Sequence, residues 1–174
     1  MTTRENGLIV VFTGHGKGKT TAALGIALRA MGHGQKTEIV QFMKGKERSG
    51  EQLLKNVPLI EVHAFGTGFF EPGDDPQPHV EAAEKGWKKA ESIILSGSAD
   101  ILVLDEISHA INFGFLPSVV VLETIRRKRP GLHIVLTGRD MPPDLMEIAD
   151  IATEMKEIRH IYQSGQPAVK GIDY

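Results

Sequence analysis

Short apolar runs alternate with longer amphipathic stretches along this chain. Residues 8–12 are apolar and mostly β-branched, which is typical of a strand buried on both faces of a parallel sheet. The same reasoning predicts further strands over 36–42, 59–64, 100–106, 132–136 and 151–158, and helices over 19–31, 51–55, 80–95, 117–127 and 141–149. Because strands and helices alternate, we expect one α/β domain over residues 1–174, with a parallel sheet covered by helices on both faces.

The turn between the first strand and the first helix is rich in glycine. Residues 14–18 read Gly-His-Gly-Lys-Gly, and Lys19, Thr20 and Thr21 follow at the start of the helix. A strand, a glycine-rich loop and a helix in this order predict a phosphate-binding loop, with the P-loop, RecA-like version of the α/β fold. The helix start offers unpaired backbone N–H groups and partial positive charge to an anion. A glycine-rich turn without a ligand is the alternative.

The side chains of this loop have separable expected roles. Lys19 is predicted to contact phosphate oxygens, and the Thr20 hydroxyl to coordinate a magnesium ion. Lys17 adds a second cation. The usual spacing of four residues between the glycines would place the first glycine at residue 13, which is Thr13. The loop is therefore one residue short, and we expect phosphates to bind it in an unusual register.

Two later strands also end in side chains suited to this chemistry. The strand over 100–106 ends in Asp105 and Glu106, the Walker-B pattern whose carboxylate supports magnesium in P-loop proteins. A capped strand end before a helix is the alternative. Arg139 follows the strand over 132–136 and is well placed for a phosphate. Because ligands bind beyond the carboxyl ends of parallel strands, these groups are expected at one edge of the sheet.

Two loops carry further candidates. Residues 65–78 contain three prolines and three glycines, so no regular element is expected there, and loops of this length are often functional. Phe69 and Phe70 within this loop are expected either to pack on the core or to form an aromatic patch that binds a large, flat ligand. The basic residues of loop 43–50 are expected to be solvated, with a phosphate contact as the alternative. Trp87 is expected in the core.

Composition narrows the function classes. The chain has 174 residues, 24% of them charged, a formal net charge of −2 and no cysteine. No disulfide or thiolate metal site is possible, and no bulk basic field favours nucleic acid. Residues 126–129 are basic, and we interpret them as complementing a helix dipole rather than as a nucleic-acid patch. No apolar run approaches a membrane span of about 20 residues, so we expect a cytoplasmic protein without a membrane partner.

Taken together, the motifs resemble a known family. The segments TGHGKGKTTAALGIALRAMGHG, VQFMKG, VLDEIS and VLTGRDMPPDLMEIADIATEM, with a later RH and the terminal GIDY, look like the P-loop type of ATP:corrinoid adenosyltransferase. The resemblance runs from Gly7 over nearly the whole chain, and the family shares the shortened loop. It implies transfer of the 5′-deoxyadenosyl group of ATP to the Co(I) of a reduced corrinoid, with release of triphosphate.

The resemblance also assigns expected roles. Catalytic residues would be Lys19, Glu106, Arg139 and Phe69, and the metal, Mg²⁺ or Mn²⁺, would be held by Thr20, Asp105 and Glu106. ATP would be bound by Gly14, His15, Gly16, Lys17, Gly18, Lys19, Thr20, Thr21 and Arg139. Phe69 and Phe70 would contact the corrinoid and displace its lower axial ligand, although the family's second aromatic stands one residue later, where this chain has Glu71. The resemblance further implies a homodimer and an electron donor such as a flavodoxin or flavin reductase.

Other function classes stay open from the sequence. A P-loop kinase or ATPase would transfer the γ-phosphoryl group and would release ADP or phosphate rather than triphosphate. A RecA-like ATPase dependent on nucleic acid would bind single strands with strong salt dependence. Seven residues precede the first strand, so the N-terminal helix with which some family members cover the corrinoid site is expected to be missing or replaced.

Overall fold

The computed structural model describes residues 6–45, 50–68 and 70–172. Within these ranges, six parallel strands form one sheet in the order β3–β2–β4–β5–β1–β6. They are β1 (Ile9–Thr13), β2 (Thr37–Gln41), β3 (Ile60–Ala64), β4 (Ile101–Asp105), β5 (His133–Thr137) and β6 (Ile151–Glu154). The expected parallel α/β sheet is confirmed.

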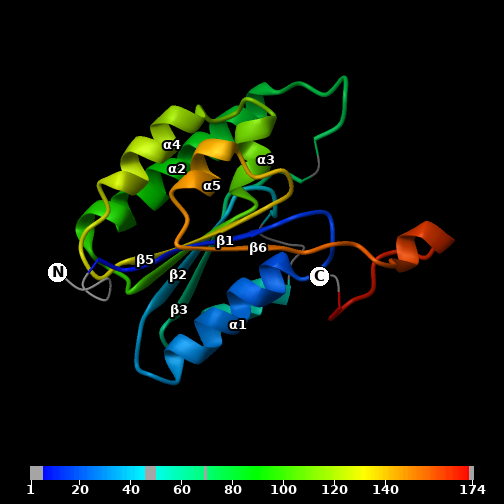
Figure 1. The fold of residues 1–174 in the computed structure, drawn as a ribbon. Helices are drawn as coiled ribbons and strands as arrows, with labels where there is room; N and C mark the ends of the chain where they lie inside the picture. Colours follow the sequence, from blue (N-terminus) through cyan, green and yellow to red (C-terminus); the bar gives the residue numbers. More distant parts are fainter. Residues whose placement is uncertain (1–5, 46–49, 69, 173–174) are drawn as a thin grey trace.

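Helices cover both faces of the sheet, as expected. The helix α1 (Lys19–Met31) lies on one face, and α2 (Gln77–Ser96), α3 (Ile107–Asn112), α4 (Ser118–Arg126) and α5 (Pro143–Glu147) lie on the other (Figure 1). Two segments, η1 (Gly50–Asn56) and η2 (Ile161–Ser164), are 3-10 helices. None of the described helices is both long and apolar enough to cross a membrane.

Alternate residues of the central strands pack into two separate hydrophobic cores, one on each face of the sheet. Val10, Val103 and Val135 pack towards the alanine-rich face of α1. Their neighbours in sequence, including Val11 and Leu104, pack with residues of α2, α4 and α5. This two-sided burial follows from the period of two along a strand, and it explains why these strands are apolar throughout. Trp87 joins the second core at 6% exposure, as predicted.

The structure differs from the expected elements in several places, and the helix predicted over 51–55 is the 3-10 helix η1. The helix α2 begins at Gln77 rather than at residue 80, and α3 was not predicted. The last strand ends at Glu154 rather than at residue 158, because the Met155 backbone turns to hydrogen-bond the phosphate loop. After His160 the chain forms a 3-10 helix and turns, with no strand among its described residues.

Two of the basic residues after α4 bind backbone carbonyls. Lys128 Nζ donates to the carbonyl oxygens of Asn6 and Gly7, and so holds the segment that enters β1. Arg129 Nη2 donates to the carbonyls of Gly97 and Ala99, just beyond the C-terminus of α2. These contacts are more specific than the dipole interaction expected from the sequence. Each side chain donates hydrogen bonds to backbone carbonyl oxygens outside regular secondary structure.

Candidate functional site

The phosphate loop has the predicted strand–loop–helix geometry. It joins β1 to α1, and Gly14 and Gly18 have φ values of 93° and 117°, a left-handed conformation that side-chain-bearing residues rarely adopt. Lys19 Nζ donates to the carbonyl oxygens of Gly14 at 2.8 Å and Gly16 at 2.9 Å. The lysine therefore lies across the loop, at the place where an anion would meet the helix start.

The Lys19 ammonium is partly buried and lies near another positive charge. Burial lowers its pKa, and the positive charge of Arg139 lowers it further, although the carboxylates of Glu106 and Asp105 act in the opposite direction. A bound polyanion would relieve this repulsion between cations, because it places negative charge between them. The charges around the loop therefore favour the binding of a phosphate group.

The segment after β6 packs directly against the phosphate loop. Gly16 N donates to the Met155 carbonyl oxygen at 2.6 Å, and Met155 N donates to the Thr13 carbonyl oxygen at 2.8 Å. A Cβ built on Gly16 would lie 2.7 Å from the Met155 carbonyl oxygen. Only glycine therefore fits at this position of the loop, and the close approach fixes the loop's shape from the outer edge of the sheet.

The two carboxylates after β4 have different surroundings. Asp105 is fully buried, and its Oδ1 accepts hydrogen bonds from the hydroxyls of Thr20 and Thr137, both at 2.8 Å. Glu106 has a left-handed backbone with φ of 61°, and its N–H donates to Thr137 Oγ1 at 2.9 Å. Asp105 thus lies beneath the site, while Glu106 lines the pocket above it.

Glu106 is the titratable group most changed by this arrangement. Burial and the negative charge of Asp105 raise its pKa to about 7, and the cations Lys44, Lys19 and Arg139 only partly oppose the rise. The fold therefore favours the protonated form of this carboxyl. A cation placed against it would favour the ionised form.

The oxygen donors at this edge suit a hard divalent cation. The Thr20 hydroxyl and the carboxylates of Asp105 and Glu106 are the ligand types that Mg²⁺ prefers. Thr20 and Asp105 are already in hydrogen-bond contact across 85 positions of sequence. The donor set therefore fits the metal that the sequence analysis predicted, and its individual ligand roles stay predictions.

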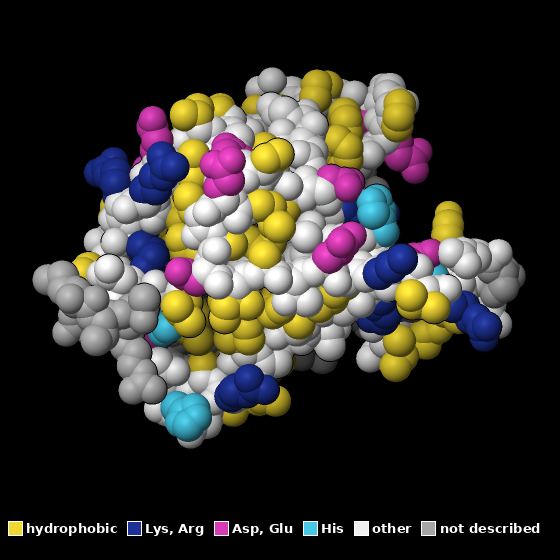
Figure 2. Space-filling model, in the orientation of Figure 1, with side chains coloured by type: hydrophobic (Ala, Val, Ile, Leu, Met, Phe, Trp, Pro, Cys, Tyr) yellow, Lys and Arg dark blue, Asp and Glu magenta, His cyan; other side chains and the backbone are white. Residues whose placement is uncertain are grey.

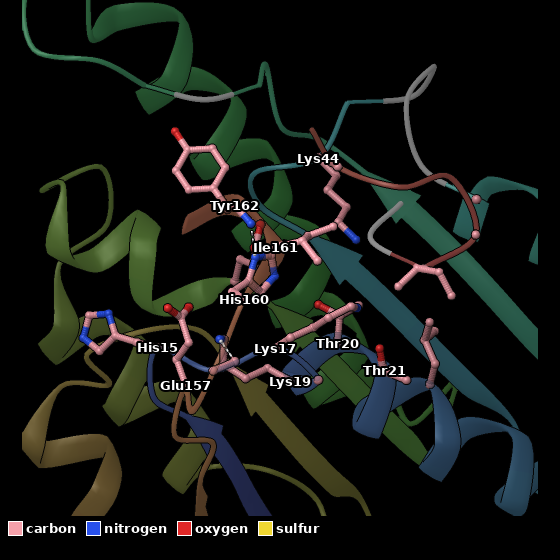
Figure 3. Close-up of a pocket in the computed structure, with 18 of the residues that line it drawn as sticks. His15, Lys17, Lys19, Thr20, Thr21, Lys44, Glu157, His160, Ile161 and Tyr162 are labelled. Atoms are coloured by element: carbon pink, nitrogen blue, oxygen red, sulfur yellow. Dashed lines mark hydrogen bonds between the residues drawn. The ribbon is translucent and has the colours of Figure 1, made fainter. Parts of the chain in front are cut away.

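A pocket of about 1130 Å³ lies over the phosphate loop. Figure 3 shows Lys17, Lys19, Thr20 and Thr21 on one wall, and Lys44, His160, Ile161 and Tyr162 on the other. Such a volume is large for a single small ligand. Of the residues predicted to bind ATP, the pocket lining includes His15, Gly16, Lys17, Gly18, Lys19, Thr20, Thr21 and Arg139, while Gly14 contributes its carbonyl beneath Lys19.

Arg139 reaches this pocket from a tightly held turn after β5. Its carbonyl oxygen accepts a hydrogen bond from Ser108 Oγ at 2.5 Å, and Gly138 before it has a φ of 142°. Next along the chain, Asp140 Oδ1 lies 3.2 Å from His15 Nε2. These contacts place the turn beside the phosphate loop, so the predicted meeting of Arg139 and Lys19 at one sheet edge is confirmed.

Lys44 is a pocket residue that the sequence analysis placed at the solvated surface. Its Nζ lies 2.7 Å from Glu51 Oε1, and both side chains line the pocket. Burial alone would lower the Lys44 pKa, but the charge of Asp105, the hydrogen bond to Glu51 and the charge of Glu106 together raise it. The solvated interpretation is therefore wrong for Lys44; Lys46 and Arg48 lie outside the described residues.

The C-terminal tail also supplies pocket residues, and the sequence patterns did not predict this. Glu157, His160, Ile161 and Tyr162 line the pocket, with Glu157 beside His15 and Lys17 and the other three above the phosphate loop (Figure 3). Figure 2 shows basic, acidic and histidine side chains gathered where this tail meets the body of the molecule. The only signal in the sequence was the RH dipeptide at 159–160, noted for its family resemblance.

The predicted aromatic residues have different outcomes. Phe69 lies outside the described residues. Phe70 packs edge-to-face on Phe115 with ring centroids 5.1 Å apart, and it also contacts His79 and Phe113. This aromatic cluster borders the core beneath α2 and α4, although Phe113 keeps 44% of its surface exposed. Phe70 therefore packs on the core, and its contact with a corrinoid stays a prediction.

His109 lies between this aromatic cluster and the phosphate loop. Burial lowers its pKa, and the charges of Arg139 and Lys19 lower it further. Its ring centroid is 6.1 Å from that of Phe113. His109 therefore packs beside the aromatic cluster and feels the charges of the phosphate-loop cations.

The sequence was compared with protein families and with known proteins, and the matches are consistent with a nucleotide-binding site of this kind. A family model described as "ATP:corrinoid adenosyltransferase BtuR/CobO/CobP" matches residues 5–174. The corrinoid adenosyltransferase of Escherichia coli K12 is 36% identical over 170 residues, which cover 98% of this chain and 87% of that protein. Those of Pseudomonas aeruginosa and Sinorhizobium are 36% and 38% identical, and the alignments cover 98% and 99% of this chain and 85% and 82% of those proteins. The chain therefore belongs to the ATP:corrinoid adenosyltransferase family.

Proposed function

We propose that this protein transfers the 5′-deoxyadenosyl group of ATP to the Co(I) centre of a reduced corrinoid and releases inorganic triphosphate. The observation that carries the proposal is the convergence of Lys19, Thr20, Glu106 and Arg139 on one pocket beside a shortened phosphate loop. Relatives that align over nearly the whole chain are named corrinoid adenosyltransferases, which supports the same activity here.

The reaction balances without a proton transfer. The Co(I) lone pair attacks the 5′-carbon of ATP, and the bond between that carbon and its oxygen breaks. The electron pair of the broken bond leaves with triphosphate, and cobalt becomes formally Co(III). Negative charge on the leaving group is stabilised by positioned cations, and Lys17, Lys19 and Arg139, which all line the pocket, would supply them.

The metal site is assigned to Thr20, Glu106 and Asp105. A bound Mg²⁺ or Mn²⁺ would neutralise charge on the triphosphate. Both oxygens of Asp105 already accept hydrogen bonds, from Thr20 and Thr137 on one side and from Gln41 on the other. Asp105 is therefore better suited to orient the Thr20 hydroxyl, whereas Glu106 offers its oxygens to the pocket.

The corrinoid is assigned to the side of the pocket near loop 65–78. Phe69 is the residue proposed to take the place of the lower axial ligand of Co(II), because a water-excluding ring is a poor neighbour for a polar ligand. Phe70 would support it from the aromatic cluster. Phe113 offers an exposed aromatic surface beside Phe70.

The remaining assignments come from the composition of the chain and from the family resemblance. They are a single domain over residues 1–174, a homodimer, a cytoplasmic location and an electron donor of the flavodoxin or flavin reductase class. The donor would be needed because Co(II) must gain one electron before the transfer can begin.

Product analysis tests the proposed activity directly. The protein is incubated without oxygen with ATP, Mg²⁺ and chemically reduced cobalamin, and the phosphate products are separated. We expect light-sensitive adenosylcobalamin and triphosphate in equal amounts. ADP or orthophosphate as the main product would instead support a kinase or ATPase, and turnover that depends on single-stranded nucleic acid would support a RecA-like motor.

A further inference from the structure

Three neighbouring strands end in buried polar side chains at the same level of the sheet. Gln41 of β2 pairs in register with Asp105 of β4, and Leu104 pairs with Leu136, which places Asp105 beside Thr137 of β5. All three polar residues are fully buried. Asp105 and Thr137 belong to the site described above, and Gln41 is the third polar residue at this level of the sheet.

Gln41 touches the site through one end of its amide. Its Nε2 donates to Asp105 Oδ2 at 3.2 Å. A carboxylate oxygen can only accept, so the amide nitrogen must face Asp105 and the amide oxygen must face away. That oxygen, Oε1, is buried and has no hydrogen-bond partner among the described residues.

An unsatisfied buried acceptor is costly. Leaving such a group without a partner typically costs about 1–3 kcal/mol, and an apolar side chain of similar shape would avoid that cost. Gln41 is therefore a poor choice for packing alone. Its amide contact with Asp105 points instead to a role at the functional site, where such unsatisfied groups are common.

We propose that Gln41 is a positioning residue for the metal site. Its amide N–H holds Oδ2 of Asp105, so that Oδ1 stays directed at the hydroxyls of Thr20 and Thr137. Gln41 acts through Asp105 and Thr20 and does not contact the ion itself. This inference rests on the metal assignment within the proposed function, and it adds a residue to that site.

The test uses Gln41→Met, which keeps the length of the side chain and removes both polar ends. The affinity for ATP is measured by calorimetry with Mg²⁺ and again with EDTA, and Mn²⁺ binding in the presence of ATP is measured by electron paramagnetic resonance. We expect Mn²⁺ affinity to fall at least about 10-fold, the usual effect of losing such a supporting contact. ATP affinity in EDTA should stay unchanged, and stability in urea should be equal or higher.

Thr37→Val is the matched control. Thr37 lies at the other end of β2, is equally buried, and has a hydroxyl oxygen without a partner among the described residues. Its replacement removes an unsatisfied oxygen about 13 Å along the strand from Gln41. We expect stability to be unchanged or higher and Mn²⁺ affinity to be unchanged.

Several outcomes would overturn the inference. Unchanged Mn²⁺ affinity in Gln41→Met would make Gln41 a packing residue, and so would lower stability accompanied by an equal loss of ATP affinity in EDTA. If Gln41→Met does not fold, Gln41→Leu is measured in the same way, and failure of both to fold also rejects a positioning role. No corrinoid is present in these measurements, so a failure of adenosyl transfer would not affect them.

Discussion

Replacing Glu106 with glutamine is expected to stabilise the protein while it impairs the metal site. Burial and the neighbouring Asp105 raise the pKa of Glu106 to about 7 from an ordinary value of 4.5. The fold therefore favours the protonated form, and it is destabilised as pH rises and the carboxyl ionises. Glutamine resembles the protonated acid in shape and never carries the charge.

The pKa sets the size and the pH range of this effect. At roughly 1.4 kcal/mol for each pH unit, a rise from 4.5 to about 7 corresponds to about 3 kcal/mol. This cost is absent below pH 4.5, grows between pH 4.5 and 7, and is complete above pH 7. We therefore expect Glu106→Gln to gain about 2–3 kcal/mol at pH 8, because solvent at the carboxyl reduces the full value, and less than about 1 kcal/mol at pH 5.

Urea unfolding at both pH values provides the assay. It is carried out in EDTA and without ATP, so that ligand binding does not contribute to stability. Glu123→Gln is the control, since Glu123 is exposed on α4 and its loss should change stability by less than about 0.5 kcal/mol at either pH.

A gain that is the same at both pH values would refute the reasoning, because an effect of shape or helix propensity does not depend on ionisation. No gain at pH 8 would mean that the lysines and Arg139 fully compensate the buried charge. In the same variant, loss of Mg²⁺-dependent ATP binding would identify Glu106 as a residue kept for function at the expense of stability.

Gly16→Ala should destabilise the fold by at least about 2 kcal/mol in urea, because a Cβ there would lie 2.7 Å from the Met155 carbonyl oxygen. Gly25→Ala, in the open middle of α1, should instead stabilise it by about 0.5–1 kcal/mol. Lys89 and Ser98 donate to the Glu38 carboxylate and lower its pKa to about 2 despite burial. Glu38→Gln should therefore cost about 2 kcal/mol at pH 7, and the difference should shrink as pH falls from 4.5 towards 2. Phe69→Ala should lose most adenosylation activity when the assay starts from Co(II) and a reductant, and much less when Co(I) is supplied. Equal losses from both starting states would contradict the proposed displacement of the lower ligand.

The order of elements and the phosphate loop could be predicted from the sequence alone. Apolar runs identified the central strands β1, β4 and β5, because strands buried on both faces are apolar at nearly every position. The loop, Lys19 and the Asp105–Glu106 pair were recognisable because each depends on residues that are adjacent in the chain. Their meeting at one edge followed from the rule that parallel strands share an orientation.

Contacts between distant segments were decided only by the tertiary structure. Gln41 and Asp105 are separated by 64 positions, and no pattern within β2 marks its last residue as a partner of the site. The carbonyl of Met155 closes on Gly16 through backbone atoms, which every residue type has, so side-chain identity gives no signal. The pocket position of Lys44 depends on how η1 packs against β3 and presents Glu51. Residues adjacent in the chain thus determined the helices, the strands and the phosphate loop. Packing between distant segments determined which side chains and backbone groups surround that loop.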